Sequence, residues 1–493
     1  MRGSTMMNTM KDMQKSRQAE DIVLIINPSL WYKPMYPTGI LCLSNYLEAH
    51  GIPNTIIDSR LFKGKIGPEK GHKLVIDTVG NMKPKLVGFS STHAEFDEVV
   101  KMNRGIREFG GSILSIVGGS QPTFRSSDFL DNGFDFVCVG EGERTLHEFA
   151  VEAIHGTNRW GKIDGLVYRD RGKILKNKSR TLLPETELAV GEFNAYGKID
   201  KRYFDFSVEI IRGLPLRGGL LLTTRGCPYS CSFCGCNAIF GRSLRFRPIE
   251  DIELELIHLK EEYRVEGIWI IDDTFIVNKK HAFLVAELLK KYKLIWGCQS
   301  RVDTIDRSAM EYLKRCGCVQ IDFGVESGSQ RILDEIIGKG TNVEQIENAF
   351  ALAKEYGMRT LANFMIGLPT ETLEDLKATK RVAKSIGSDI YVFSIATPLP
   401  GTRLYDLVGE DIAPHQYAEL NWNGSRMTAR LNKSAISDVI KEKTHLKRKY
   451  LFRSMLRSIF AGKELIGPIL KREPLGRIKA ILRFVLTHLL RRP

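Results

Sequence analysis

The chain alternates short β-branched runs with helical patterns in two long series, and this alternation constrains its fold more than any other feature. In the first series, residues 21–155, the runs "DIVLIINP", "KLVGFSS" and "SILSIVGG" are typical of buried strands. Helical patterns such as "TGILCLSNYLEAHG" separate the runs, and glycines follow several strand ends. The series therefore predicts a doubly wound parallel sheet.

Small residues end two strands of this predicted sheet. Ser90 ends one strand, and Gly118 and Gly119 end the next. Because ligands of doubly wound sheets lie at the carboxyl ends of the strands, we expect these three residues to bind a ligand. The alternative for the two glycines is a turn without a ligand.

A second series covers residues 216–410 with regular spacing. Its strand-like runs are "GLLLTT", "GIWIID", "LIWGCQS", "VQIDFGV", "RTLANFMIG" and "DIYVFSIA", with a helical pattern after each of the first five. This series predicts a (β/α)6 partial TIM-like barrel. Chemistry in barrels lies at the carboxyl ends of the strands, which here carry Cys227, Asp272, Arg301, Glu326 and Gly367.

The length of 493 residues suggests about two to four domains. We expect the first sheet in residues 21–155, the barrel in 216–410, and between them, in 156–215, a linker that contains a β-hairpin, "IDGLVYRDRGKILKN". Residues 411–493 are expected to form a helical, basic C-terminal region. From Lys441 to the end, fifteen Lys and Arg face three Glu, a local net charge of +12 in a chain of net charge +14.

Four of the nine cysteines lie within one short loop, at 227, 231, 234 and 236. Three thiolates in one loop can converge on zinc or on an iron–sulfur cluster. A structural zinc site needs a fourth ligand, and the pair Cys316 and Cys318 matches poorly in spacing. A 4Fe–4S cluster held by Cys227, Cys231 and Cys234 keeps one iron open to a cofactor or substrate. Cys236 as a fourth ligand would close the site, and this alternative stays open.

The loop resembles the cluster-binding motif of the radical S-adenosylmethionine superfamily, whose open iron binds the amino and carboxylate groups of S-adenosylmethionine. The stretches "IDDTF", "FGVESGSQRIL", "NFMIGLPTE" and "TPLPGTRLY" resemble the strand motifs of its cobalamin-dependent branch. The resemblance implies that cofactor-binding residues include Asp272, Glu326, Asn363 and Gly367. Arg301 joins them by its strand-end position. For Asp272 and Glu326 a helix-capping role is the alternative, and for Arg301 a surface charge.

The first series resembles the cobalamin-binding domain of the same branch, which is Rossmann/flavodoxin-like. The stretches "YPTGILCLSNYLEAHG", "VGGSQPTF" and "GFDFVCVGEGERTLHEF" carry this resemblance. The sequence has no Asp-x-His-x-x-Gly, and Gln121 stands where such domains often have His. The resemblance therefore implies cobalamin without a protein histidine ligand, and loss of cobalamin binding is the alternative.

The expected activity is that of a cobalamin-dependent radical enzyme, most simply a methyltransferase. It would methylate an unactivated carbon of a small-molecule or lipid-like substrate through a 5′-deoxyadenosyl radical, with electrons from an external flavodoxin-type or ferredoxin-type donor. One alternative is a cyclase, ring-contracting or oxidising enzyme without methyl transfer. Another is an iron–sulfur or cobalamin sensor without turnover. A tRNA methylthiolating enzyme is disfavoured, because the first series holds only Cys42 and Cys138.

The sequence shows no export signal and no spanning segment, which indicates a cytoplasmic protein. Near the end, Leu475, Ile478, Ile481, Val485 and Leu489 fall at helical spacing among basic residues. This pattern is typical of a helix on an anionic membrane surface, and the alternative is a helix packed on the protein's own barrel. Nucleic acid is not expected as a partner, because aromatic residues for base stacking are sparse there.

Overall fold

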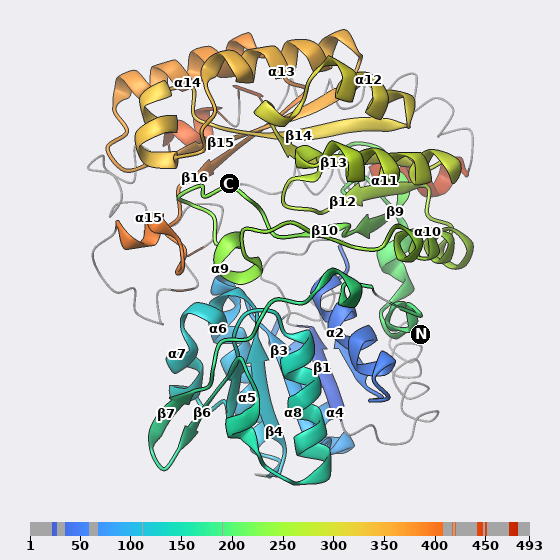
Figure 1. The fold of residues 1–493 in the computed structure, drawn as a ribbon, viewed down its shortest axis with the longest axis vertical. Coiled ribbons are helices and arrows are strands. Elements are labelled where there is room, and N and C mark those ends of the chain that lie inside the picture. Colours follow the sequence, from blue (N-terminus) through green and yellow to red (C-terminus); the bar gives the residue numbers. More distant parts are fainter. Residues whose placement is uncertain are drawn as a thin grey trace. The chain divides into compact units, whose positions relative to one another are not determined.

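The computed structural model describes residues 22–26, 35–58, 68–110, 112–189, 191–407, 417, 420, 441–446, 449–450 and 473–481. The chain forms two compact units. The first unit contains Met1–Tyr32, Gly39–Thr181 and Asn194–Ile199, and the second contains Lys33–Thr38, Leu182–Phe193 and Asp200–Pro493. The two units are described separately below (Figure 1).

The first unit is built on a seven-stranded sheet in the order β2-β1-β3-β4-β5-β6-β7. Its first five strands are parallel: β1 (Ile22–Ile26), β2 (Thr55–Asp58), β3 (Leu86–Ser90), β4 (Leu114–Gly118) and β5 (Phe136–Cys138). Helices connect them: α2 (Thr38–Ala49), α4 (Pro68–Met82), α5 (Phe96–Arg107), α6 (Ser120–Phe124), α7 (Ser126–Asp131) and α8 (Glu143–His155), which follows β5. The predicted doubly wound sheet is confirmed. Its switch point, where ligands of such folds bind, lies between β1 and β3.

A β-hairpin extends this sheet on one side. β6 (Leu166–Asp170) pairs antiparallel with β5 and with β7 (Lys173–Lys176). The turn between them uses Arg171 and Gly172, both with positive φ. The hairpin that the sequence placed in a linker is therefore part of the first sheet.

The second unit is built on a curved sheet in the order β16-β15-β14-β13-β12-β9-β8. Six strands run parallel: β9 (Leu216–Leu221), β12 (Gly267–Ile270), β13 (Ile295–Arg301), β14 (Cys318–Glu326), β15 (Arg359–Ile366) and β16 (Ile390–Ile395). The short β8 (Phe206–Ser207) joins the edge antiparallel. β16 and β8 are the two ends of this strand order, so the sheet stays open and the predicted partial barrel is confirmed.

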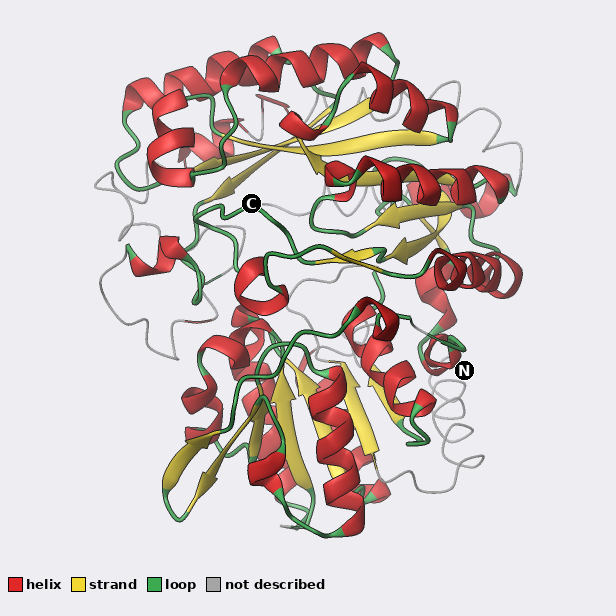
Figure 2. Cartoon of the chain, in the orientation of Figure 1, coloured by secondary structure: helices red, strands yellow, loops and turns green. Residues whose placement is uncertain are grey.

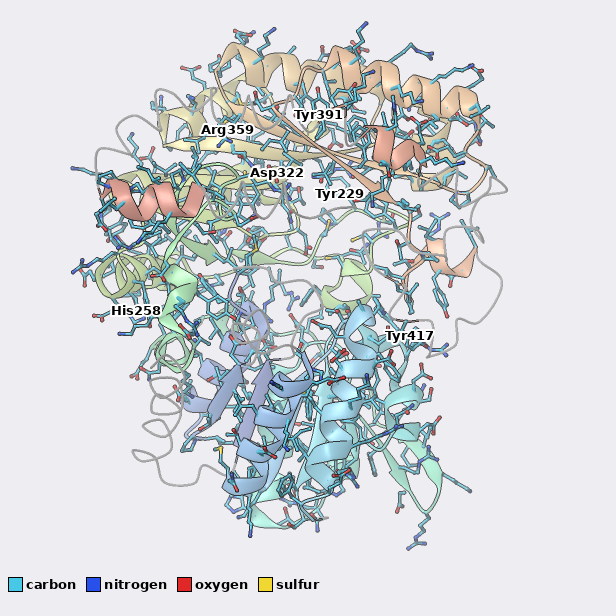
Figure 3. The ribbon with its side chains drawn as sticks, turned by 180° about the vertical axis from the view of Figure 1, so that it is seen from behind. Tyr229, His258, Asp322, Arg359, Tyr391 and Tyr417 are labelled. Carbon is cyan, nitrogen blue, oxygen red and sulfur yellow. The ribbon has the colours of Figure 1, made fainter. Side chains whose placement is uncertain are left out.

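Helices cover the outer face of the curved sheet (Figure 2). They are α10 (Ile249–Tyr263), α11 (Lys279–Lys291), α12 (Arg307–Arg315), α13 (Val343–Glu355) and α14 (Leu373–Ser385). Alternation along β14 explains the two faces, because Phe323 packs against Phe350 of α13 with ring centroids 5.3 Å apart. Gln320 and Asp322 alternate with Phe323 along the strand and belong to the other face. Gln320 Nε2 donates to Asp322 Oδ1 at 2.8 Å, and burial raises the pKa of Asp322 to about 6. Figure 3 shows Asp322 and, on β15, Arg359.

Most of the expected C-terminal region, residues 411–493, lies outside the described residues. Residues 441–446 and 474–481 are helical. Within the part of the chain that the structure describes, no helix has both the length and the apolar character needed to span a membrane.

Candidate active site

The cysteine loop follows β10 (Thr224–Arg225) and leads into α9 (Cys236–Phe240) at the carboxyl end of β9. Gly226 starts it with φ +94°, and a Cβ there would lie 2.3 Å from the carbonyl oxygen of Ser243. In the middle, Ser232 N–H donates to Ile337 O at 2.9 Å, and Ser232 O accepts from Leu404 N–H at 2.9 Å. Protein contacts therefore hold the loop at its start and at its centre.

The three predicted ligands lie together in this loop. Burial is the main cause that raises the pKa of Cys227 and of Cys231, and it raises the pKa of Cys234 to about 11. Cys234 N–H donates to Cys231 O at 3.1 Å, which turns the loop between these two ligands. Among the described residues, no group of three His, Cys, Asp or Glu side chains converges on a site for a single metal ion. Soft thiolate donors in a partly buried loop fit an iron–sulfur cluster.

Cys236 is held by a carboxylate. Its thiol donates to Asp273 Oδ2 at 2.9 Å, while its backbone N–H approaches Cys234 Sγ at 3.5 Å. Burial raises the pKa of Asp273. The thiol of the fourth cysteine, Cys236, is therefore hydrogen-bonded to Asp273, and its backbone lies next to Cys234.

Asp272 is fully buried and hydrogen-bonds to two threonines. Oδ1 accepts from Thr223 N–H at 2.6 Å, and Oδ2 accepts from the hydroxyls of Thr223 and Thr224 at 2.5 and 2.9 Å. Burial raises its pKa to about 6, and the threonine hydrogen bonds limit the rise. Asp272 therefore ties the end of β12 to the segment that leads into the cysteine loop, and does not cap a helix.

Arg301, at the end of β13, contacts the cysteine loop. Its guanidinium stacks on the ring of Tyr229 at 3.5 Å, a loop residue labelled in Figure 3, and its Nη1 lies 3.9 Å from Cys231 Sγ. Asp303 accepts from Nε at 2.9 Å and from Nη2 at 2.7 Å, and Lys339 O accepts from Nη2 at 2.6 Å. The guanidinium is thus fixed beside one thiol of the cluster loop.

Glu326 ends β14 in a left-handed conformation, with φ +65°. Its Oε1 accepts from Lys339 Nζ at 2.8 Å, and Lys339 Nζ also donates to Gly324 O at 2.5 Å. A π-helical turn, Ile332–Ile337, followed by Gly338 at φ +63°, returns the chain so that Lys339 reaches Glu326. Both Lys339 and Arg301 favour the thiolate of Cys231, although burial raises its pKa overall.

The end of β15 carries the remaining two predicted residues. Gly367 has φ +78°, and its N–H donates to Glu371 Oε2 at 2.6 Å. Burial raises the pKa of Glu371 to about 7. Asn363 is half-buried and lies beside Gly324 in the strand register. The structure thus brings Arg301, Glu326, Asn363 and Gly367 to three neighbouring strands.

In the first unit, Ser90 and Gly118 are register partners at the ends of β3 and β4. Gly119 has φ +111°, and a Cβ there would lie 2.5 Å from Ser91 O. His93 Nδ1 is hydrogen-bonded to Gln121 Oε1, and burial lowers the pKa of His93 to about 4. The buried Gln121 Nε2 has no hydrogen-bond partner among the described residues. Gly118 and Gly119 carry no side chains at this edge, which fits the close approach of a large ring cofactor.

Sequence reasoning did not single out Tyr229 and Lys339, and of the pair Asp272 and Asp273 it assigned the cofactor role to Asp272 alone. Asp273 stands next to the chosen Asp272, and only the fold shows which of the two turns to the loop. Lys339 carries no motif signal, because its place depends on the π-helical turn.

Two family matches cover the two units. Residues 221–383 match the radical SAM superfamily, and residues 32–150 match the B12 binding domain. These matches imply a 4Fe–4S cluster, S-adenosylmethionine and cobalamin as cofactors.

Three curated relatives span most of the chain. An uncharacterized methyltransferase of Pyrococcus horikoshii is 33% identical over 344 residues, 69% of this chain and 72% of the relative. Cytidylyl-2-hydroxyethylphosphonate methyltransferase of Streptomyces wedmorensis is 26% identical over 78% of this chain and 80% of its own. The anaerobic magnesium-protoporphyrin IX monomethyl ester cyclase of Rubrivivax gelatinosus is 24% identical over 78% and 68%.

Among solved structures, the radical S-adenosylmethionine methyltransferase TsrM from Kitasatospora setae, with cobalamin and a [4Fe-4S] cluster bound, has the same fold. Its TM-score is 0.64 at 20% identity, over 79% of this chain and 75% of TsrM. The cysteine loop on a partial barrel, the doubly wound first unit and these matches agree with one another. The chain belongs to the cobalamin-dependent radical S-adenosylmethionine enzymes.

Proposed function

We propose that the protein methylates an unactivated carbon of a small-molecule or lipid-like substrate. The observation that carries methyl transfer is the similarity to methyltransferases over 69% and 78% of the chain. A charge division around the cysteine loop, with Asp273 beside Cys234 and the ion-paired Arg301 and Lys339 beside Cys231, supports the binding of S-adenosylmethionine. When bound, the cofactors supply a 5′-deoxyadenosyl radical and a transferable methyl group, and the protein supplies their placement.

The charge division suits the methionine moiety of S-adenosylmethionine, which presents an ammonium and a carboxylate group. Asp273 would attract the ammonium group, and Arg301 with Lys339 would attract the carboxylate group. This assignment gives Asp273 the role that the sequence suggested for Asp272, since the carboxylate of Asp272 is bound to Thr223 and Thr224. Cys227, Cys231 and Cys234 would hold the cluster, and Asn363, Gly367 and Glu326 would line the nucleoside.

The first unit would hold cobalamin at the edge formed by Ser90, Gly118 and Gly119. The neutral His93 and Gln121 lie at the same edge and hydrogen-bond each other. Because the Nδ1 of His93 is bound to Gln121 and its pKa is lowered by burial, we assign the pair to shaping the edge and not to binding cobalt.

A second candidate is a cyclase or oxidising enzyme that uses the same cofactors without methyl transfer. The similarity to a magnesium-protoporphyrin cyclase favours it. The two candidates differ in the fate of S-adenosylmethionine, because methyl transfer produces S-adenosylhomocysteine in addition to 5′-deoxyadenosine.

The test uses anaerobically reconstituted protein with a strong reductant, S-adenosylmethionine and extracts from a strain that lacks the protein. We expect S-adenosylhomocysteine and 5′-deoxyadenosine to form together, and the deletion strain to accumulate a compound one methylene lighter than its normal product. Formation of 5′-deoxyadenosine alone would support the second candidate. Binding of the cofactors without either product would indicate a sensor.

Two finer points complete the proposal. The cluster would receive its electron from an external donor of the flavodoxin or ferredoxin type. The protein would work in the cytoplasm, with peripheral contact to the membrane through the C-terminal segment 475–492.

A further inference from the structure

The helical segment of residues 474–481 is anchored to the second unit through a buried arginine. Arg477 is 1% exposed. Its Nη1 donates to Pro215 O at 2.6 Å, and its Nη2 donates to Glu266 Oε1 at 2.6 Å. The guanidinium also lies 4.5 Å from the ring centroid of Phe206. A buried charge with this many partners fixes the rotation of the segment about its own axis.

Two further contacts support the same orientation. Arg217 stacks on Phe206 at 4.2 Å and forms an ion pair with Glu473 at 2.9 Å, just before the segment. A Cβ on Gly476 would lie 2.7 Å from the ring of Phe206. The segment therefore presents a polar side chain and a glycine to the barrel.

Two apolar residues of the segment face away from the barrel, whereas Ala480 is buried and Ile481 is half-buried. Leu475 is 76% exposed and Ile478 is 46% exposed. A helix packed on its own protein normally buries its apolar stripe and exposes its charges. Residues 474–481 do pack on the barrel, as the alternative reading had it, but through Gly476, Arg477 and Ala480, while Leu475 and Ile478 stay exposed. We call Leu475 and Ile478 the outward face.

The sequence continues this stripe in a strongly basic context. Leu482, Val485, Leu486 and Leu489, which lie outside the described residues, follow at helical spacing. From Lys441 onward the net charge is +12, and Lys479 is exposed beside the outward face. An apolar stripe flanked by cations is complementary to the surface of an anionic bilayer.

We propose that the outward face enters the surface of an anionic phospholipid membrane, and that Arg477 is the positioning residue that presents it. The inference deepens the peripheral contact proposed above and is independent of the chemistry. The cations add an attraction that salt screens over a Debye length of about 8 Å at physiological ionic strength.

The test measures binding of the full-length protein to sedimented vesicles, without reductant, so that a failure of the proposed chemistry leaves the result unaffected. Vesicles of phosphatidylcholine and phosphatidylglycerol in equal parts are compared with phosphatidylcholine alone. We expect binding to the anionic vesicles that weakens with salt. The double variant Leu475→Ser and Ile478→Ser should reduce the partition by about tenfold per residue, from the transfer free energy of these side chains.

The matched control replaces two leucines of similar exposure on barrel helices, Leu373 at 75% and Leu284 at 46%, with Ser. This control should bind vesicles like the wild type, and both double variants should keep the wild-type melting temperature. Equal binding by the Leu475/Ile478 variant, or equal loss in the control, would overturn the proposal. A lower melting temperature of the Leu475/Ile478 variant, or its conversion from oligomer to monomer, would also overturn it, in favour of packing within the fold or against a second copy.

Discussion

The two parallel sheets each present the carboxyl ends of their strands as a binding edge, but the two edges differ in charge. In the first unit the edge consists of Ser90, Gly118, Gly119 and the neutral pair His93 and Gln121. In the second unit the edge carries Asp273 beside the cysteine loop, and Arg301 and Lys339 near Cys231, where they are ion-paired with Asp303 and Glu326. The comparison indicates that a glycine-lined edge suits the close approach of a large ring, and that charged groups of both signs suit a small zwitterion.

The largest expected effect concerns the charged edge. Replacing Cys227, Cys231 or Cys234 with Ala should abolish assembly of the 4Fe–4S cluster, because each removes one of three thiolate ligands. Replacing Cys236 with Ala should keep the cluster, since its thiol is bound to Asp273. The iron and sulfide content per chain after anaerobic reconstitution tests both expectations. Loss of the cluster in the Cys236 variant would show a closed, four-cysteine site.

The next effect concerns the neutral edge. Gly119→Ala should abolish uptake of hydroxocobalamin, because the new Cβ would lie 2.5 Å from Ser91 O at a φ of +111°. Gly133→Ala is the matched control, with φ +90° and no atom within 4 Å of the new Cβ. It should bind the corrinoid normally and lose about 1 kcal/mol of stability from backbone strain. Uptake by the Gly119 variant, measured by absorbance after gel filtration, would place the corrinoid elsewhere.

A smaller effect concerns the pH dependence of stability that the buried His93 causes at the first edge. His93 has a pKa of about 4 in the folded protein, lowered by burial from 6.5. The unfolded chain therefore binds more protons than the folded one between these values, and stability falls as the pH falls through this window. The loss between pH 7 and pH 5 should be about 2 kcal/mol.

His93→Gln should remove most of this pH dependence. Hydrogen exchange of peptides from β3 and β4, corrected for intrinsic rates, measures the opening free energy at each pH. Equal pH dependence in the wild type and the variant would contradict a buried neutral histidine at this edge.

The smallest effect concerns the cationic side of the cysteine loop. Arg301→Leu removes the guanidinium 3.9 Å from Cys231 Sγ. Reduction adds negative charge to the cluster, so loss of the cation should lower the midpoint potential. The shift of the midpoint potential should be on the order of 50 mV. For one electron, 59 mV corresponds to a tenfold change in the reduction equilibrium constant, so this shift is slightly less than tenfold.

Arg315→Leu is a suitable control, since Arg315 also stacks on a tyrosine, Tyr312, at 4.8 Å, on α12. It should leave the potential unchanged. A potential titration followed by electron paramagnetic resonance distinguishes the two variants, and equal potentials would assign Arg301 to packing alone.

The sequence predicts both sheets because their strands are buried on two faces and read as β-branched runs between helical periods. It also predicts the three thiols, since ligand spacing within one loop needs no tertiary information. It does not decide between Asp272 and Asp273, because adjacent residues at a strand end turn to opposite sides. The exposure of Leu475 and Ile478 could not be predicted, because helical periodicity gives a stripe but not what lies against it.

The anchors of the cysteine loop have a consequence for how the protein is loaded with iron. Gly226, Ser232 and the threonine contacts of Asp272 fix the loop through protein groups alone. Ordering a free residue costs about 1–2 kcal/mol of conformational entropy, so protein contacts that hold the loop lower the cost of keeping three thiols in one place for the cluster. These anchors therefore contribute to the affinity for the cluster, although none of them is a ligand.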